Sequence, residues 1–112
     1  MSGAASIRKG KNFERSTAAR IRDAMPGATV QRGLQYRSGE EVADVEMPVF
    51  WLELKKHRLC NIRAALRQAQ RTCPPGRIAT AITQDDRARP MVTMDFDDWL
   101  EFVREWWDRR ER

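Results

Sequence analysis

Two carboxylates and one lysine near the middle of the chain have the types and spacing of a metal-dependent hydrolytic site. Glu53 follows Asp44 by nine residues, and Lys55 follows Glu53 by two. Side chains on a β-strand alternate between its faces, so Glu53 and Lys55 share one face if this stretch is extended. Mg²⁺ prefers oxygen ligands, which Asp44, Glu53 and the backbone carbonyl of Leu54 could supply. A lysine beside the metal would stabilise the charge that develops as a phosphodiester is cleaved.

A simpler interpretation of these residues stays open. Asp44 or Glu53 could form an ion pair with Lys55 on a solvated face of the sheet, without any chemistry. Aspartate, glutamate and lysine are common residues, and the spacing between these three is short. The pattern alone therefore does not separate a catalytic site from a structural salt bridge.

The segment around these residues predicts a β-hairpin. Residues 42–46 and 49–55 are rich in β-branched, aromatic and leucine side chains, and Met47-Pro48 lies between them as a turn. Two adjacent strands would bring Asp44 next to Glu53 and Lys55. The opposite face of the second strand is apolar and consists of Phe50, Leu52 and Leu54.

Three segments repeat apolar residues every three or four positions and therefore predict helices. They are residues 12–25, residues 61–72 and a final segment that starts at Phe96. In the final segment Trp106 and Trp107 are adjacent and cannot fully share one face, so one of them is expected to be exposed or to contact a partner chain. The residues expected to cap the three helix starts are Asn12, Asn61 and Asp95.

Strands, a helix and a returning strand in this order indicate an α/β domain with a central mixed sheet flanked by helices. Residues 9–108 would form this single domain, between a flexible tail at residues 1–8 and a charged tail at residues 109–112. The remaining strands are expected at residues 29–32, 77–83 and 90–94, and a polar loop at residues 33–40.

The whole chain has the composition of one globular domain. It contains 112 residues, of which 41% are hydrophobic and 33% charged, and its formal net charge is +5. The positive charge favours a polyanion such as nucleic acid as a partner. Neither a membrane-spanning apolar run nor the apolar core of a signal peptide is found, so a cytoplasmic protein is expected. Cys60 and Cys73 are expected to be reduced, and together with His57 they make a weak zinc site.

Three motifs in order carry a resemblance to a known superfamily. They are Lys9-Gly10-x-x-Phe13-Glu14-Arg15, Asp44-Val45 and Trp51-Leu52-Glu53-Leu54-Lys55. This order resembles the PD-(D/E)xK nucleases, and more narrowly the small Holliday-junction-resolvase-like nucleases of archaea and phages. The resemblance covers about residues 8–103. It implies a restriction-endonuclease-like core and a DNA endonuclease that uses Mg²⁺, or Mn²⁺ as a substitute, and that cuts branched DNA such as four-way junctions in a phage-infected or prokaryotic cell.

The resemblance also implies roles for individual residues. Asp44 and Glu53 match the metal ligands, Lys55 matches the catalytic lysine, and Glu14 matches a helix-borne glutamate that assists metal or water. Gln68 matches a glutamine that several members place near the site, although a solvated glutamine fits equally well. One departure is Ala43, where the name of the superfamily has proline. Ser38 in the polar loop is a partial match to a serine of the resolvase loop. Independently of the resemblance, Glu46 shares a strand face with Asp44 and could support it, although a surface role fits better. Glu14 could instead be an ion-pair partner of Lys11 or Arg15 on the helix surface.

The expected partners follow from charge and from the reaction. Many basic residues lie near the motifs, and of these Lys9, Lys11 and Lys56 are expected to contact DNA phosphates. Because junction resolution needs two coordinated cuts, a two-fold homodimer is expected. Three alternatives remain: a nuclease for flaps, ends or nicked duplex, a non-catalytic basic DNA-binding module, and an RNA-binding protein, for which the strands lack an aromatic signature.

Overall fold

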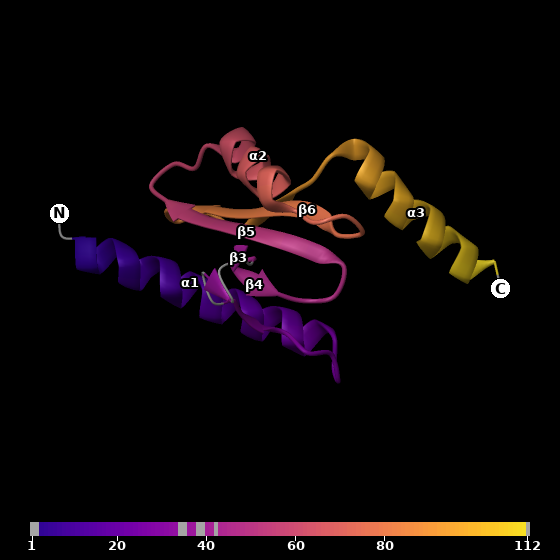
Figure 1. Ribbon diagram of the computed structural model, residues 1–112, viewed down its shortest axis with the longest axis horizontal. Coiled ribbons are helices and arrows are strands. Elements are labelled where there is room, and N and C mark those ends of the chain that lie inside the picture. Colours follow the sequence, from indigo (N-terminus) through magenta and orange to yellow (C-terminus); the bar gives the residue numbers. More distant parts are fainter. Residues whose placement is uncertain (1–2, 34–35, 38–39, 42, 112) are drawn as a thin grey trace.

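The computed structural model describes residues 3–33, 36–37, 40–41 and 43–111 and confirms an α/β domain with a mixed sheet (Figure 1). In the described part of the chain, no helix is both long and apolar enough to cross a membrane. In chain order the elements are α1 (Gly3–Ala24), β1 (Gln31–Arg32), β2 (Tyr36–Arg37), β3 (Glu40–Glu41), β4 (Val45–Glu46), β5 (Phe50–His57), α2 (Ile62–Thr72), β6 (Ile78–Asp85), β7 (Met91–Thr93) and α3 (Phe96–Arg110).

The five-stranded sheet has the order β1-β4-β5-β6-β7, and β2 and β3 form a separate two-stranded ribbon. Strands β4 and β5 are antiparallel, with Val45 opposite Leu52, which confirms the predicted hairpin. Strands β5 and β6 are parallel, with Glu53 opposite Ala81. A parallel pair needs a crossover connection, and α2 provides it.

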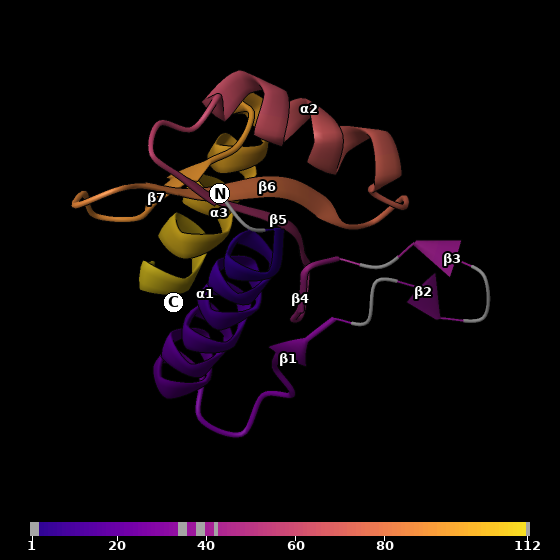
Figure 2. The same ribbon diagram turned by 90° about the vertical axis from the view of Figure 1, so that its left-hand side faces the viewer.

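Helices α1 and α2 cover opposite faces of the sheet (Figures 1 and 2). On the α1 side, Phe13 packs into a core with Val45, Leu52, Leu54 and Ile82. On the α2 side the buried residues are small, because alanines line both the helix and β6 and allow the two to approach closely. These residues are Ala65, Ala69, Ala79 and Ala81.

The predicted start is wrong for α1 and correct for α2. Helix α1 begins at Gly3, so residues 3–8 are helical rather than an irregular tail, and the prediction of Asn12 as its cap is wrong. Asn61 caps α2 as predicted, since its side-chain oxygen accepts a hydrogen bond from the Ala64 amide at 3.0 Å. The start of α1 was missed because periodic apolar residues indicate only the part of a helix that packs against the core. A polar extension before that part has no such periodicity.

Helix α3 projects from the sheet, as Figure 1 shows at the right. Asp95 stands at its N-cap, but the carboxylate accepts a hydrogen bond from Gln70 at 2.9 Å and caps no helix amide. The helix includes Arg109 and Arg110 of the expected charged tail, and none of its residues is buried. The radius of gyration, 14.8 Å, exceeds the value of about 13 Å expected for a compact domain of this length.

The strands differ from the predicted ranges mainly in length. Strand β6 continues to Asp85, past the turn expected to begin at Gln84, whereas β1, β4 and β7 are shorter than predicted. Part of the predicted polar loop at residues 33–40 belongs to the β2–β3 ribbon, whose register pairs Tyr36 with Glu41. Short polar strands lack the apolar alternation on which strand prediction depends.

Candidate active site

Asp44 is fixed against β5 by hydrogen bonds from both its backbone and its side chain. Its amide donates to the Leu52 carbonyl at 2.9 Å, and its Oδ2 accepts from the Leu54 amide at 2.8 Å. Its own carbonyl accepts a hydrogen bond from the Gly33 amide at 2.9 Å. Two hydrogen bonds therefore fix the backbone of Asp44 and a third orients its carboxylate before any ligand binds, and such preorganisation favours catalysis.

Glu53 lies beside this aspartate in a largely desolvated position. Its side chain is 14% exposed, and Lys55 Nζ lies 3.7 Å from its Oε2. Burial, followed by the hydrogen bond and the negative charge of Asp44, raises the pKa of Glu53 from 4.5 to about 8, although Lys55 acts in the opposite direction. The structure thus brings Asp44, Glu53 and Lys55 together, as the strand alternation predicted.

The backbone at Leu54 faces the same edge of β5 as Asp44. The amide and carbonyl of one strand residue point to the same edge, and the Leu54 amide donates to Asp44. The Leu54 carbonyl therefore also points toward the edge on which Asp44 lies. This placement is compatible with a metal ligand, and the role itself stays a prediction.

Glu14 reaches the same region from α1 but is engaged elsewhere. Its Oε1 accepts a hydrogen bond from Arg32 Nε at 2.8 Å, so its ion-pair partner is neither Lys11 nor Arg15. Glu14, Lys11 and Asp44 nevertheless line one cavity of about 250 Å³. Arg32 would therefore compete with a metal or a water molecule for Oε1 of Glu14.

Two further predicted residues, Gln68 and Glu46, form hydrogen bonds with groups outside the carboxylate pair. Gln68 is half-buried on α2, and its backbone carbonyl accepts a hydrogen bond from the Thr72 hydroxyl at 3.4 Å. The Glu46 carboxylate accepts a hydrogen bond from Gln31 at 3.3 Å, across the β1–β4 pair. Ser38 lies outside the described residues. A role for Gln68 at the site stays a prediction.

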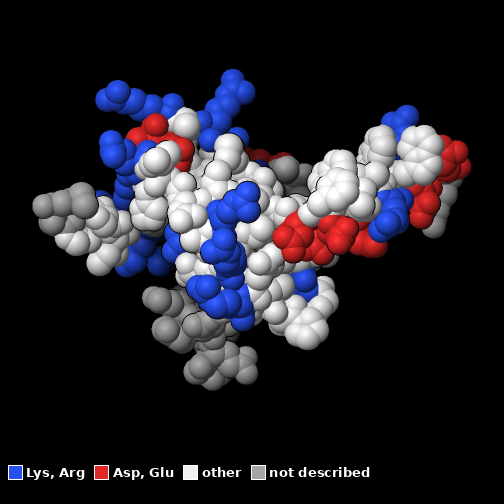
Figure 3. Space-filling model, turned by 90° about the horizontal axis from the view of Figure 1, so that it is seen from above, with Lys and Arg blue, Asp and Glu red and all other residues white. Residues whose placement is uncertain are grey.

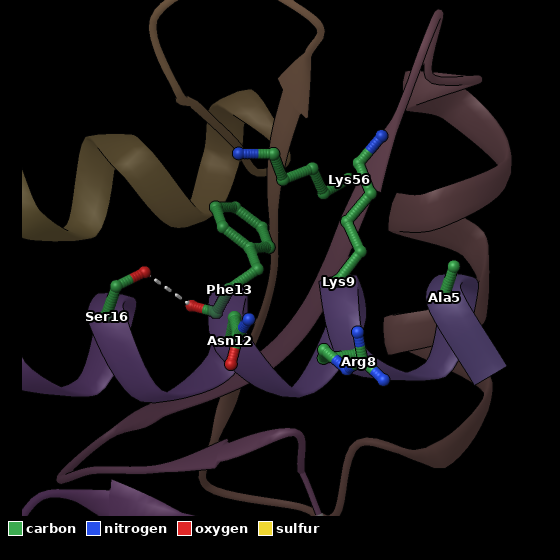
Figure 4. Close-up of a pocket in the computed structure, with 7 residues that line it drawn as sticks. All are labelled: Ala5, Arg8, Lys9, Asn12, Phe13, Ser16 and Lys56. Carbon is green, nitrogen blue, oxygen red and sulfur yellow. Dashed lines mark hydrogen bonds between the residues drawn. The ribbon is translucent and has the colours of Figure 1, made fainter.

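Basic side chains lead from the surface to the candidate site. Seen from the α2 side, Lys and Arg spread over the body of the protein (Figure 3). Lys9 rises from α1 and Lys56 from β5, beside the ring of Phe13 (Figure 4). Lys9 pairs with Asp86 at 2.9 Å, whereas Lys56 donates to the neutral side chain of Gln84 at 3.1 Å.

A cavity of about 660 Å³ connects these basic residues with the candidate catalytic lysine. Its lining includes Lys9 and Lys56 together with Lys55 and Arg58. A phosphate backbone placed along this cavity would therefore meet positive charge on its way to the carboxylates.

The oxygen donors at the site fit a hard divalent cation. Asp44 and Glu53 present carboxylates, and a cation between them would compensate the negative charge that the raised pKa of Glu53 shows to be unfavourable here. Among the described residues, no group of three or more histidine, cysteine, aspartate or glutamate side chains is placed to hold a metal ion. Water and phosphate oxygens would have to complete the coordination, as is usual for Mg²⁺. The two cysteines that are the candidate zinc ligands are free thiols.

Arg32 and Gly33 contribute to the site without any signal in the sequence. Arg32 binds Glu14 over a separation of 18 residues, and Gly33 binds the backbone of Asp44. No helical or strand spacing relates residues so far apart. Only the pairing of β1 with β4 brings Arg32 opposite Val45 and so places both residues beside the site.

Gly33→Ala should disturb the site, because the new methyl group would collide with the carbonyl oxygen of Ala43. We expect a loss of about 1 to 3 kcal/mol in unfolding free energy, typical of overpacking. Gly10→Ala is the matched control, since its Cβ would meet open space within α1 and should add about 0.5 to 1 kcal/mol. Urea denaturation of both variants checks this, and equal effects of the two would contradict it.

Comparison with known proteins adds no relative. No protein-family model matches the chain, and no curated protein or solved structure matches it significantly.

Proposed function

We propose that this protein is a metal-dependent DNA endonuclease that hydrolyses phosphodiester bonds, acts on branched DNA such as four-way junctions and works in the cytoplasm. The observation that carries the proposal is the contact of Asp44 with the largely desolvated Glu53, with Lys55 beside it, 3.7 Å from Glu53. Two carboxylates in contact are electrostatically unfavourable, so structural needs alone do not favour their pairing. A site for a divalent cation gives the pair a function.

Asp44, Glu53 and Lys55 would have different roles in the reaction. A bound Mg²⁺ or Mn²⁺ supplies Lewis-acid polarisation of the phosphate and lowers the pKa of water. Asp44 and Glu53 would hold the cation. The hydrogen bond from the Leu54 amide orients the Asp44 carboxylate, and two further bonds fix the backbone of Asp44. Lys55 would place its ammonium against the charge that grows on the phosphate oxygens in the transition state.

DNA is the substrate that the charge distribution favours. The chain carries a net charge of +5, and the cavity beside Lys55 is lined by further cations. Phosphate contacts of this kind give affinity that falls as salt rises. Branched DNA and a homodimer come from the resemblance and from the need for two coordinated cuts, so flaps and ends remain alternative substrates within the same function.

Lys56→Ala should weaken DNA binding without removing the site. Lys56 makes no contact with the carboxylate pair, and its ammonium lies between Gln84 and Phe13. We expect the slope of log affinity against log salt to fall by about 1, the effect of losing one phosphate contact. Fluorescence anisotropy with labelled duplex over a salt series measures the slope, and an unchanged slope would remove Lys56 from the DNA path.

Cleavage of matched DNA substrates tests the proposed function. A four-way junction, a flap, a linear duplex and a single strand are incubated with the protein and Mg²⁺, Mn²⁺ or chelator. Paired symmetric nicks on the junction, absent in chelator, are expected. If another substrate is cut instead, the protein is a nuclease but its substrate is not the four-way junction.

A second candidate function is a non-catalytic DNA-binding module. The 3.7 Å approach of Lys55 to Glu53 favours it, because an ion pair is all that such a module needs at this position. Absence of metal-dependent cutting on every substrate, with DNA binding retained, would support the module over the nuclease.

A further inference from the structure

Helix α3 presents an apolar face that the described residues of the chain leave largely exposed. None of its residues is buried, and Phe96, Trp99, Trp106 and Trp107 are between 50% and 68% exposed. Phe102 of α3 stacks on Phe50 of the sheet, with ring centroids 4.9 Å apart. An exposed patch of large aromatic side chains marks an interaction site.

The spacing of these residues suits packing against another helix. Phe96, Trp99, Val103 and Trp106 follow one another by three, four and three residues, the repeat with which two helices pack along a common seam. Leu100 and Trp107 lie on the same side and widen it. Val103 stands at the middle residue of α3, so a two-fold axis there would superpose the seam on itself.

The charges of α3 argue against nucleic acid as its partner. The helix carries five aspartates or glutamates and three arginines, in a chain with a net charge of +5. Figure 3 shows the carboxylates gathered along the projecting helix, away from most of the basic side chains of the body. A DNA backbone would be repelled by this net negative helix, whereas a protein surface would not.

The order of the charges along α3 favours a second copy of the helix, packed antiparallel, as its partner. Asp97 and Asp98 lie in the first turn of α3, and Arg109 and Arg110 lie in its last turn. Two copies of α3 packed antiparallel would place the acidic end of each beside the basic end of the other. A parallel pair would instead juxtapose like charges at both ends.

We infer that α3 is a self-association surface and that two copies of the chain pair through antiparallel α3 helices, with the two-fold axis near Val103. The four exposed aromatic side chains of α3 offer roughly 400 to 500 Å². This is at least half of the roughly 800 Å² per partner that a stable interface buries, part of which is a polar rim.

This inference deepens the proposed function and rests on it for its purpose, because two symmetric sites would serve two coordinated cuts. Its test needs neither DNA nor metal. A dimer that cuts no DNA would overturn the nuclease alone, and a cleaving monomer would overturn the α3 pairing alone.

Sedimentation equilibrium of the full chain provides the first test. Wild type is expected to be a dimer at about 100 µM, where even micromolar interfaces are mostly formed. Trp99→Lys and Trp106→Lys should each raise the dissociation constant about thirtyfold or more, as for a central tryptophan anchor. Leu59→Lys is the control, because Leu59 is 76% exposed outside α3 and should leave the dimer intact. A monomeric wild type, or equal weakening by Leu59→Lys, would overturn the inference.

Charge reversal separates pairing from the ordinary effect of charges on a helix. Asp97→Arg with Asp98→Arg, or Arg109→Asp with Arg110→Asp, should each weaken the dimer, and the four changes together should restore it. If the charges acted only through the helix dipole, each reversal would destabilise α3, and the fourfold variant would be the least stable of the three. Circular dichroism monitors helix content in the same samples. Failure of the fourfold variant to recover dimerisation, or growth of wild type into assemblies larger than a dimer, would overturn the antiparallel arrangement.

Discussion

Lys55→Met should lower the rate of DNA cleavage at saturating DNA by about a hundred- to a thousand-fold, the loss typical when one preorganised charge-stabilising group is removed. The substitution keeps the aliphatic stem and deletes the ammonium that lies 3.7 Å from Glu53. Single-turnover cleavage of the preferred substrate measures the effect. DNA affinity should change little, because the ammonium stabilises charge that develops in the transition state.

Lys56→Met provides the matched comparison for this loss. Lys56 is the next residue of β5, and its side chain lies on the opposite face, over Phe13. Removing its charge should weaken DNA binding but leave the saturated cleavage rate near that of wild type. Equal losses of saturated rate in the two variants would show that Lys55 contributes only positive charge for DNA binding. Normal cleavage by Lys55→Met would show that Lys55 forms only a structural salt bridge with Glu53.

Glu53→Gln should stabilise the metal-free protein at alkaline pH while abolishing metal-dependent cleavage. The pKa of Glu53 is raised from 4.5 to about 8 by burial and by Asp44. The folded state therefore retains the Glu53 proton where the unfolded state has lost it. Its stabilising contribution is complete below pH 4.5 and is lost as pH rises toward and through 8. Glutamine stays neutral throughout and avoids this loss.

Urea denaturation from pH 5 to pH 9 in chelator measures the difference. The variant should gain on the order of 2 to 4 kcal/mol relative to wild type at the alkaline end and much less at the acidic end. Glu105→Gln, an exposed carboxylate on α3, is the control and should show no such trend. A constant difference between Glu53→Gln and wild type over this range would contradict the raised pKa.

The same variant tests metal binding without any cleavage. Mg²⁺ that binds only the folded protein should raise the melting temperature of wild type at pH 8. It should raise that of Glu53→Gln much less, because the amide is a weaker ligand than the carboxylate. An equal response of both proteins would place the cation elsewhere.

The alternating pattern of residues 49–55 was sufficient to predict the centre of the candidate site. Strand alternation puts Glu53 and Lys55 on one face whatever the rest of the chain does, and the hairpin pairing of Val45 with Leu52 follows from short-range connection. The α/β class and the Asn61 cap were equally local signals. Each depends on residues close together in the chain, where spacing and side-chain type suffice.

The sequence by itself therefore determined the mixed sheet, two packed helices and the Asp44, Glu53 and Lys55 constellation. Only the tertiary structure decided that Glu14 binds Arg32, that Gly33 supports Asp44 and that no residue of α3 is buried. The first two features join residues that are distant in the chain. The third depends on whether any other element packs against the apolar side of α3. A helix that faces a core and a helix that faces a partner have the same periodicity, so local pattern cannot distinguish them.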